Sequence, residues 1–350
     1  MSPMKILVVR LSSLGDVLHL FPAISDLRRR FPDAQIHWLI EPAFAQLAGW
    51  HFAVDRVIEA PLRSHKKSLR KVPRLLHGLS RELKAEKYDF VIDAQGLLKS
   101  ALLARLAGAD VFGFDKPREA LAARFYCRTA KVEPGLHVVE KNRQLIAKLF
   151  GADISQPADF GLDAFRDRQA LPDTLKNFVD RPCVVLLHGT TWDSKYWPES
   201  SWLELIGLLG RQGVRCLLPW GNEEEHRRAQ RLAAEGDAQV LPKLSLGDLT
   251  SVLLHAQCFV SVESGIGHLA TVLDIPGIML HGPTDPGYSG ILGRRCEHIT
   301  GKLDCSPCFK RNCPRPAPDG TPPCQLKITS RQIFERCTAL IESLGRGVAC

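Results

Sequence analysis

The sequence contains no long apolar run and no export signal. No stretch approaches the roughly 18 apolar residues that a membrane-spanning helix needs. At the N-terminus only four apolar residues separate Lys5 from Arg10, which is too short for the apolar region of a signal peptide. We therefore expect a cytoplasmic protein.

A close internal repeat and the nucleotide fingerprint of dehydrogenases are also missing. A G-x-G sequence opens a helical pattern only late in the chain, at Gly265 to Gly267, whereas dehydrogenases carry it directly after their first strand. This position argues against a dehydrogenase. Aromatic residues are not interleaved with the basic ones, so the stacking surfaces that bind single-stranded nucleic acid are missing as well.

What the sequence does contain is the composition of a soluble globular protein. Its 350 residues, 45% hydrophobic and 24% charged, are too many for one ordinary core and predict two domains. The formal net charge is +8, and basic residues are concentrated between Arg63 and Lys87. This segment predicts an anionic partner. An anionic membrane surface suits it better than nucleic acid, because each nearby Lys or Arg adds about 1 kcal/mol of attraction.

Short apolar runs alternate with helical patterns in both halves, which is typical of parallel sheets flanked by helices. The predicted strands are Lys5–Val9, Gln35–Ile40, Arg56–Glu59, Phe90–Asp93, Val111–Phe114, Val184–His188, Val214–Leu218, Phe259–Val262 and Gly277–His281. The predicted helices are Asp16–Arg30, Val72–Glu86, Leu98–Leu106, His137–Phe150, Glu199–Leu209, Glu223–Glu235, Leu246–His255, Ile266–Leu273 and Ser330–Leu344. The periodicity is lost between Gly151 and Pro182, which predicts a linker. We therefore expect α/β domains at 1–165 and 166–328, followed by a terminal helix at 329–350.

The stretch from Val8 to His19 combines the end of a strand with the start of a helix. Asp16 falls in the first helical turn, beyond the carboxyl end of the first strand, where open α/β sheets bind ligands. One hypothesis makes this carboxylate a catalytic base. The alternative is structural, because Asp is common at helix starts, where it caps free amides and complements the helix dipole.

Three loops of the second half could bind a nucleotide sugar. Thr190, Thr191 and Lys195 supply the hydroxyls and the positive charge that a diphosphate needs. The acidic run Glu223–Glu225 could hold a ribose through one carboxylate. Ser261–His268 joins a strand to a helix and would present backbone amides to an anion. The alternatives are an ordinary turn with a solvated Lys, acidic residues at a helix start, and a core or capping histidine.

Six motifs taken together resemble the ADP-heptose:lipopolysaccharide heptosyltransferases, and the heptosyltransferase I branch in particular. They are L-S-S-L-G-D-V-L-H (Leu11–His19), D-A-Q-G-L-L-K-S (Asp93–Ser100), H-G-T-T-W-D-S-K-Y-W-P-E (His188–Glu199), L-P-W-G (Leu218–Gly221), S-V-E-S-G-I-G-H-L (Ser261–Leu269) and G-P-T-D-P-G (Gly282–Gly287). They occur in order over nearly the whole chain. The resemblance implies a GT-B glycosyltransferase, with an N-terminal Rossmann-like acceptor-binding domain and a C-terminal Rossmann-like donor-binding domain that face one another across a cleft.

The resemblance also implies an activity and a set of site residues. The activity is inverting transfer of L-glycero-D-manno-heptose from ADP-heptose to a Kdo residue of lipopolysaccharide, with Kdo-lipid A as acceptor, at the inner face of the cytoplasmic membrane. Asp16 matches the general base. The implied donor-binding residues are Thr190, Thr191, Lys195, Glu225, Glu263, Ser264, Gly265 and His268. The implied acceptor-binding residues are Arg63, Lys66, Lys67, Lys99, Arg118 and Arg143.

The chain departs from the family pattern at three positions. Glu263 stands where an Asp is usual, which puts the identity of the transferred sugar in doubt. Gly189 replaces a more usual Ala, which we interpret as a small change. His65 interrupts the basic string of the acceptor loop and leaves the phosphorylation of the acceptor open.

Four cysteines, Cys305, Cys308, Cys313 and Cys324, form a C-x2-C-x4-C-x10-C cluster. Four thiolates suit a structural zinc or iron ion. The alternatives are a disulfide-forming loop and four free thiols. No D-x-D sequence lies beside the diphosphate loop, so we expect the transfer itself to need no metal or other cofactor.

The sequence is also compatible with two other functions. One is an ADP-heptose-dependent transferase whose acceptor is another glycan or a protein. The other is a basic nucleic-acid-binding protein, which the basic segment suggests and the distribution of aromatic residues disfavours.

Overall fold

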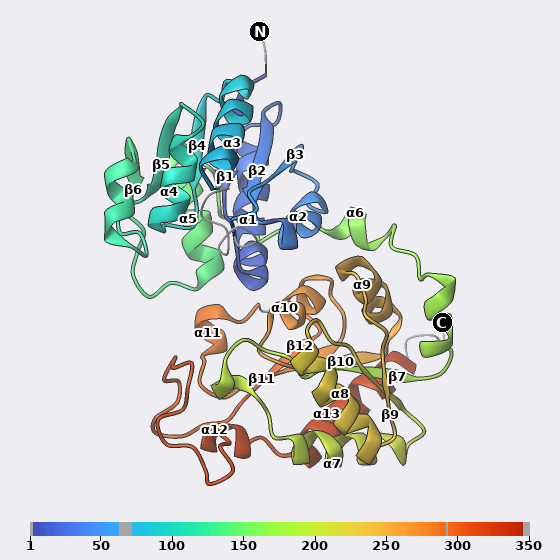
Figure 1. The fold of residues 1–350 in the computed structure, drawn as a ribbon. Helices are drawn as coiled ribbons and strands as arrows, with labels where there is room; N and C mark the ends of the chain where they lie inside the picture. Colours follow the sequence, from blue (N-terminus) through green and yellow to red (C-terminus); the bar gives the residue numbers. More distant parts are fainter. Residues whose placement is uncertain (1–2, 63–71, 292, 346–350) are drawn as a thin grey trace. The chain divides into compact units, whose positions relative to one another are not determined.

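The computed structural model describes residues 3–62, 72–291 and 293–345. The chain forms two compact units, Met1–Asp167 and Arg168–Cys350, each built on its own sheet (Figure 1). This confirms the predicted α/β class. The division falls two residues beyond the predicted domain boundary, and the C-terminal helix belongs to the second unit.

The first unit contains a parallel sheet of six strands in the order β3-β2-β1-β4-β5-β6. Its strands are β1 (Lys5–Val9), β2 (Gln35–Ile40), β3 (Arg56–Glu59), β4 (Phe90–Asp93), β5 (Asp110–Phe114) and β6 (Arg128–Ala130). Its helices are α1 (Leu14–Arg30), α2 (Pro42–Gly49), α3 (Val72–Glu86), α4 (Leu98–Arg105), α5 (Val138–Phe150) and α6 (Asp163–Arg166), with a 3-10 helix η2 (Ala120–Phe125).

Helices cover both faces of this sheet because its strands alternate buried side chains to either side. Leu7 and Val9 of β1 pack with Leu83 of α3 on one face. On the other face Trp38 of β2 meets Phe21 of α1 edge to face, with 5.9 Å between the ring centroids. Because helices pack on both faces of the sheet, the polar residues of the motifs lie at the ends of its strands.

The second unit repeats this plan with six parallel strands in the order β12-β11-β10-β7-β8-β9. Its strands are β7 (Cys183–Leu187), β8 (Arg215–Leu218), β9 (Ala238–Val240), β10 (Cys258–Val262), β11 (Gly277–His281) and β12 (Cys296–Thr300). Its helices are α7 (Glu199–Gly210), α8 (Glu223–Glu235), α9 (Leu246–His255), α10 (Gly265–Val272), α11 (Pro286–Ser289), α12 (Pro323–Leu326) and α13 (Ser330–Gly345), with 3-10 helices η3 (Asp173–Phe178) and η4 (Asp193–Lys195).

The core of the second unit shows why α13 is part of it. Ile333 and Cys337 of α13 are fully buried in the same cluster as Trp202 and Leu205 of α7 and Val260 of β10. The terminal helix therefore covers one face of the sheet rather than standing apart.

The strand order reverses once in each sheet. In the first unit the reversal lies between β1 and β4, and in the second between β7 and β10. The loops that leave the carboxyl ends of such strands diverge to opposite faces and leave a crevice, where α/β proteins bind ligands. These two strand pairs also carry most of the predicted motifs.

No helix in the described ranges is long and apolar enough to cross a membrane.

Candidate active site

In the first unit, Asp16 lies in the first turn of α1, directly after β1. Its Oδ1 is 3.0 Å from the guanidinium of Arg10, and its Oδ2 accepts hydrogen bonds from both the backbone N–H and the hydroxyl of Ser13, each at 3.0 Å. The Asp16 side chain keeps 35% of its surface exposed. Asp16 therefore accepts hydrogen bonds at the N-terminus of the helix and still presents a carboxylate to solvent.

The surroundings of Asp16 keep it ionised. Burial raises the pKa of the carboxyl, but Arg10, the Ser13 N–H and His19 lower it by more, so the pKa lies below its ordinary value of 3.8. At neutral pH the group is a carboxylate that can accept a proton. Because its pKa is low, it is a weak base in the ground state.

Arg10 is a site residue that the sequence did not reveal. Its guanidinium donates to the carbonyl of Ala94 at the end of β4, while its backbone carbonyl accepts from Trp38 at 3.1 Å. Burial and then the charge of Arg10 lower the pKa of the Lys141 ammonium group on α5, so Lys141 lies within electrostatic range of Arg10. Arg10 thus places a cation beside Asp16, and Lys141 lies near Arg10, a suitable setting for an anionic substrate.

The D-A-Q-G motif holds the loops after β1 and β4 together. The Gln95 side chain accepts from the Leu11 N–H at 2.8 Å. Asp93 is fully buried, and its carboxylate accepts from the Ser100 hydroxyl at 2.9 Å and the Tyr126 hydroxyl at 2.7 Å. Burial raises the pKa of Asp93. These residues act as supports rather than as reactive groups.

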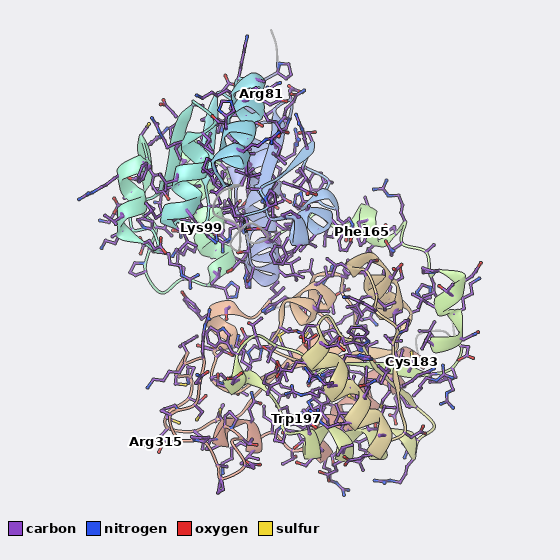
Figure 2. All side chains as sticks on the ribbon, in the orientation of Figure 1. Arg81, Lys99, Phe165, Cys183, Trp197 and Arg315 are labelled. Carbon is purple, nitrogen blue, oxygen red and sulfur yellow. The ribbon has the colours of Figure 1, made fainter. Side chains whose placement is uncertain are left out.

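Two predicted acceptor-binding residues lie on neighbouring segments at this edge. Lys99 is exposed in the first turn of α4 (Figure 2), and Arg118 is exposed in the loop after β5. The segments are tied together because the Glu119 N–H donates to the Gly96 carbonyl at 2.9 Å. Gly96 has a φ of 68°, and an added Cβ would lie 3.1 Å from the Arg118 nitrogen, so glycine allows the close approach.

The structure gives Arg143 a different role from the one predicted. Its side chain is only 5% exposed and bonds the buried carboxylate of Asp26 through two contacts, of 2.8 Å and 3.2 Å. It also donates to the Gln156 carbonyl at 2.8 Å. With these partners Arg143 fastens α5 to α1, and the prediction that it binds the acceptor is withdrawn. Arg63, Lys66 and Lys67 lie outside the described residues.

In the second unit, three loops converge on Glu263, which follows β10 and is 5% exposed. Its carboxylate oxygen Oε2 lies 3.0 Å from the Lys195 ammonium and accepts from the Thr284 hydroxyl. Its backbone carbonyl accepts from the Thr190 hydroxyl at 3.2 Å. The sequence motifs after β7, β10 and β11 therefore build one site.

Charge pairing makes the buried Glu263 a carboxylate. Burial raises its pKa, yet Lys195, His281 and Thr284 lower it by more, and the net shift is downward from 4.5. Lys195 also lies 4.3 Å from the centre of the Trp192 ring. Its side chain is 13% exposed, so the ammonium lies at the margin of the site.

Glu225 is the member of the acidic run that turns toward this site. Asn222 caps α8 by accepting from the Glu224 and Glu225 N–H groups, each at 3.0 Å. The Glu225 carboxylate instead accepts from the Gly221 N–H at 2.7 Å. An added Cβ at Gly189 would lie 2.6 Å from the Glu225 carboxyl carbon. The glycine is therefore more than a small change, because it leaves the space that this carboxylate occupies.

The remaining donor-binding residues lie at the start of α10 and beside Thr190. The Ser264 hydroxyl caps the helix by accepting from the Gly267 N–H at 3.1 Å, and Gly265 is the first helical residue. His268 is buried in the first turn. Thr191 is exposed in the loop after β7.

The cysteine cluster lies in a loop that contacts η4, the 3-10 helix that carries Lys195. Burial and the neighbouring Cys313 and Cys308 raise the pKa of the Cys324 thiol to about 11, so these three sulfurs are close. Across the described ranges, no three His, Cys, Asp or Glu side chains are grouped as metal ligands, and none of the four cysteines forms a disulfide. The loop supports η4, because the Ser194 N–H donates to the Arg311 carbonyl at 3.0 Å and its hydroxyl to the Lys310 carbonyl at 2.6 Å.

Comparison with known proteins identifies the family. A family model described as glycosyltransferase family 9 (heptosyltransferase) matches residues 76–317. This chain belongs to glycosyltransferase family 9. It is therefore a glycosyltransferase, and the nucleic-acid-binding hypothesis is not favoured.

Individual members of family 9 match most of the chain. Lipopolysaccharide heptosyltransferase 1 of Pseudomonas aeruginosa is 43% identical over 317 residues, which cover 89% of this chain and 87% of that protein. The structure of E. coli heptosyltransferase WaaC with ADP matches with a TM-score of 0.80 at 36% identity, covering 96% of this chain and all of that one. WaaC with ADP-2-deoxy-2-fluoro heptose matches with a TM-score of 0.77. These matches confirm the GT-B class.

Proposed function

We propose that this enzyme transfers heptose from ADP-heptose to a Kdo residue of the lipopolysaccharide inner core. The observation that supports it most is that each sheet gathers its motif residues where the strand order reverses. A carboxylate lies at that place in one unit, and a paired Lys and Glu with hydroxyls lies there in the other. The relatives named for this activity, and the solved structure with an ADP-heptose analogue, support the same donor.

The second unit is proposed to bind the donor. Lys195 and the hydroxyls of Thr190 and Thr191 would contact the diphosphate, because an ammonium and hydrogen-bond donors neutralise its charge. Glu225 would accept hydrogen bonds from the ribose. Glu263, Ser264, Gly265 and His268 would surround the heptose and the adjacent phosphate, where the N–H groups at the start of α10 favour an anion.

The first unit is proposed to bind the acceptor and to supply the base. The acceptor hydroxyl attacks the anomeric carbon of the heptose, the bond to the diphosphate breaks, and Asp16 takes the hydroxyl proton. The low pKa of Asp16 suits a late proton transfer, after the attack has made the hydroxyl acidic. Lys99 and Arg118 would contact the anionic acceptor. The leaving ADP would be stabilised by Lys195 without a divalent metal.

Membrane association is proposed on the basis of charge. Arg74, Arg81 and Lys84, which belong to the basic segment, are exposed on α3 (Figure 2 labels Arg81). An anionic surface would attract such a helix. We accordingly propose that the enzyme works as a peripheral protein at the inner face of the cytoplasmic membrane.

A structural zinc or iron ion at Cys305, Cys308, Cys313 and Cys324 stays a proposal from the sequence spacing. The described arrangement of these thiols does not fit four ligands around one ion. The test is the metal content of protein purified without oxygen. One equivalent of metal that is lost in a Cys308→Ser variant supports the site, and metal-free protein contradicts it.

The test of the proposed function is a transfer assay with defined substrates. ADP-heptose is offered with Kdo-lipid A or with a protein acceptor, and other nucleotide sugars replace ADP-heptose in parallel reactions. Heptose transfer to Kdo-lipid A alone is the expected result. Transfer only to the protein acceptor, or preference for another sugar, would refute it.

A further inference from the structure

A chain of hydrogen-bonded side chains runs from Lys195 into the interior of the second unit. We call this chain the relay. Its four residues lie on or directly after the neighbouring strands β10, β11 and β12, and they are Glu263, Thr284, His281 and His298. Glu263 and His281 are buried at the ends of β10 and β11, and His298 is on β12. The proposed chemistry gives no task to the two histidines.

The contacts in the relay are close and continuous. Thr284 donates to the Glu263 carboxylate, and the Thr284 oxygen lies 3.3 Å from Nδ1 of His281. Nε2 of His281 is 2.8 Å from Nδ1 of His298, and Nε2 of His298 is 3.1 Å from the carbonyl oxygen of Ile291. Both ends of the relay, the carboxylate and the carbonyl, can only accept hydrogen bonds.

The relay is one hydrogen short when both imidazoles are neutral. Its four contacts need four hydrogens, whereas Thr284 and two neutral imidazoles provide only three. Neutral His281 has one N–H and can therefore donate a hydrogen bond to His298 or to Thr284, but not to both. One added proton completes all four contacts and supplies a positive charge opposite Glu263.

In the structure Lys195 already supplies that charge. The Lys195 ammonium lies 3.0 Å from Glu263. Burial lowers the pKa of His281 to about 4, and Lys195 contributes to the lowering. His281 is accordingly neutral at neutral pH while the Lys195–Glu263 pair is intact.

Donor binding would change this balance, since the proposed function assigns Lys195 to the diphosphate. When the ammonium turns to the phosphates, the buried Glu263 loses its nearest cation. We propose that the His281–His298 pair then takes one proton from solvent, so that binding of the nucleotide sugar is coupled to proton uptake. This inference rests on the proposed function.

The charged groups around His281 shift its pKa in the directions that this coupling requires. Lys195 on η4 and His298 on β12 lower its pKa, whereas Glu263 after β10 and Asp285 at the start of α11 raise it. Withdrawal of Lys195 removes one lowering influence and leaves both raising ones. The liganded enzyme therefore binds the proton more tightly than the free enzyme, and the donor binds more tightly as pH falls.

Isothermal titration calorimetry tests the coupling. ADP-heptose is titrated into the full-length enzyme without acceptor at pH 6.5, in buffers that differ in ionisation enthalpy. Both phosphates of ADP-heptose are esterified, so the ligand does not titrate near this pH, whereas the terminal phosphate of ADP has a pKa of about 6. We expect net proton uptake when the donor binds, and an affinity for ADP-heptose that rises on acidification.

The relay variants are His281→Gln and His298→Gln, and the matched control is His255→Gln on α9, an exposed histidine outside the relay. Loss of proton uptake in a relay variant that still binds ADP-heptose, with uptake retained in the control, is the expected result. His298 is only half-buried, so its variant keeps the test available if the His281 variant fails to fold.

Two results would overturn the coupling. Unchanged uptake in both relay variants would show that Glu263 or another group takes the proton. Binding of ADP-heptose by the wild-type enzyme without any uptake would show that no proton is coupled. Failure of the wild-type enzyme to bind ADP-heptose would instead refute the proposed function itself, and the coupling with it.

Discussion

Replacement of Arg143 by Met should destabilise the first unit rather than weaken acceptor binding. Asp26 is fully buried, and Arg143 makes two of its ionic contacts. Removing one partner of a buried ion pair costs about 3–5 kcal/mol, because the other charge stays buried. Arg29 also contacts Asp26, so we expect the lower end of this range.

A loss of about 3 kcal/mol corresponds to a fall of roughly 6–12 °C in the melting temperature of a unit of this size. Thermal unfolding of Arg143→Met measures it. Adding Asp26→Asn removes the buried charge and should restore much of the loss. Arg118→Met is the matched control, since Arg118 is exposed: its melting temperature should stay unchanged while the KM for the acceptor rises.

The reasoning fails if Arg143→Met melts within about 2 °C of the wild type and its acceptor KM rises as in Arg118→Met. That outcome would return Arg143 to the acceptor site.

Three further predictions concern the site residues of the two units. Arg10→Met should move the acid limb of the kcat/KM profile to higher pH, because Arg10 lowers the pKa of Asp16 and activity needs the ionised carboxylate. Gly189→Ala should weaken ADP-heptose binding by up to about tenfold in a titration, since the new Cβ would displace the carboxylate of Glu225. Lys195→Met should weaken the same binding by roughly ten- to hundredfold, the value of a charge-assisted hydrogen bond.

A specific result would contradict each of these predictions. An unshifted acid limb in Arg10→Met would separate Arg10 from the ionisation that controls activity. Gly78→Ala is the control for Gly189→Ala, because nothing lies within 4 Å of its added Cβ, and equal effects of the two would refute the crowding. Undiminished donor binding by Lys195→Met would remove Lys195 from the diphosphate site.

The repeated pattern of strand and helix was predictable from local sequence. The prediction for α3 has the same bounds as the structure, Val72–Glu86, because apolar residues recur at helical spacing there. The edge strands β6, β9 and β12 were missed. β6 and β9 have only three residues each, and β12, Cys296–Thr300, is half-buried along its length, so none of them shows a continuous apolar run.

The site was predictable residue by residue but not as an arrangement. Motif resemblance selected Asp16, Lys195 and Glu263, which the structure places at the carboxyl edges of their own sheets. It could not reveal that Arg143 is paired with Asp26, since 117 residues separate them and the contact depends on the packing of α5 against α1. The charges around Asp16 and the relay behind Glu263 depend in the same way on contacts between distant segments.

The most direct test of the account is the rate of heptose transfer by Asp16→Asn at saturating ADP-heptose and Kdo-lipid A. Asn keeps the size of the side chain and can still accept from Ser13, but it cannot take a proton. We predict a kcat lower by about 10²–10⁴-fold with ADP-heptose affinity unchanged, the range for loss of a general base. A kcat close to that of the wild type would contradict the assignment of Asp16 as the base.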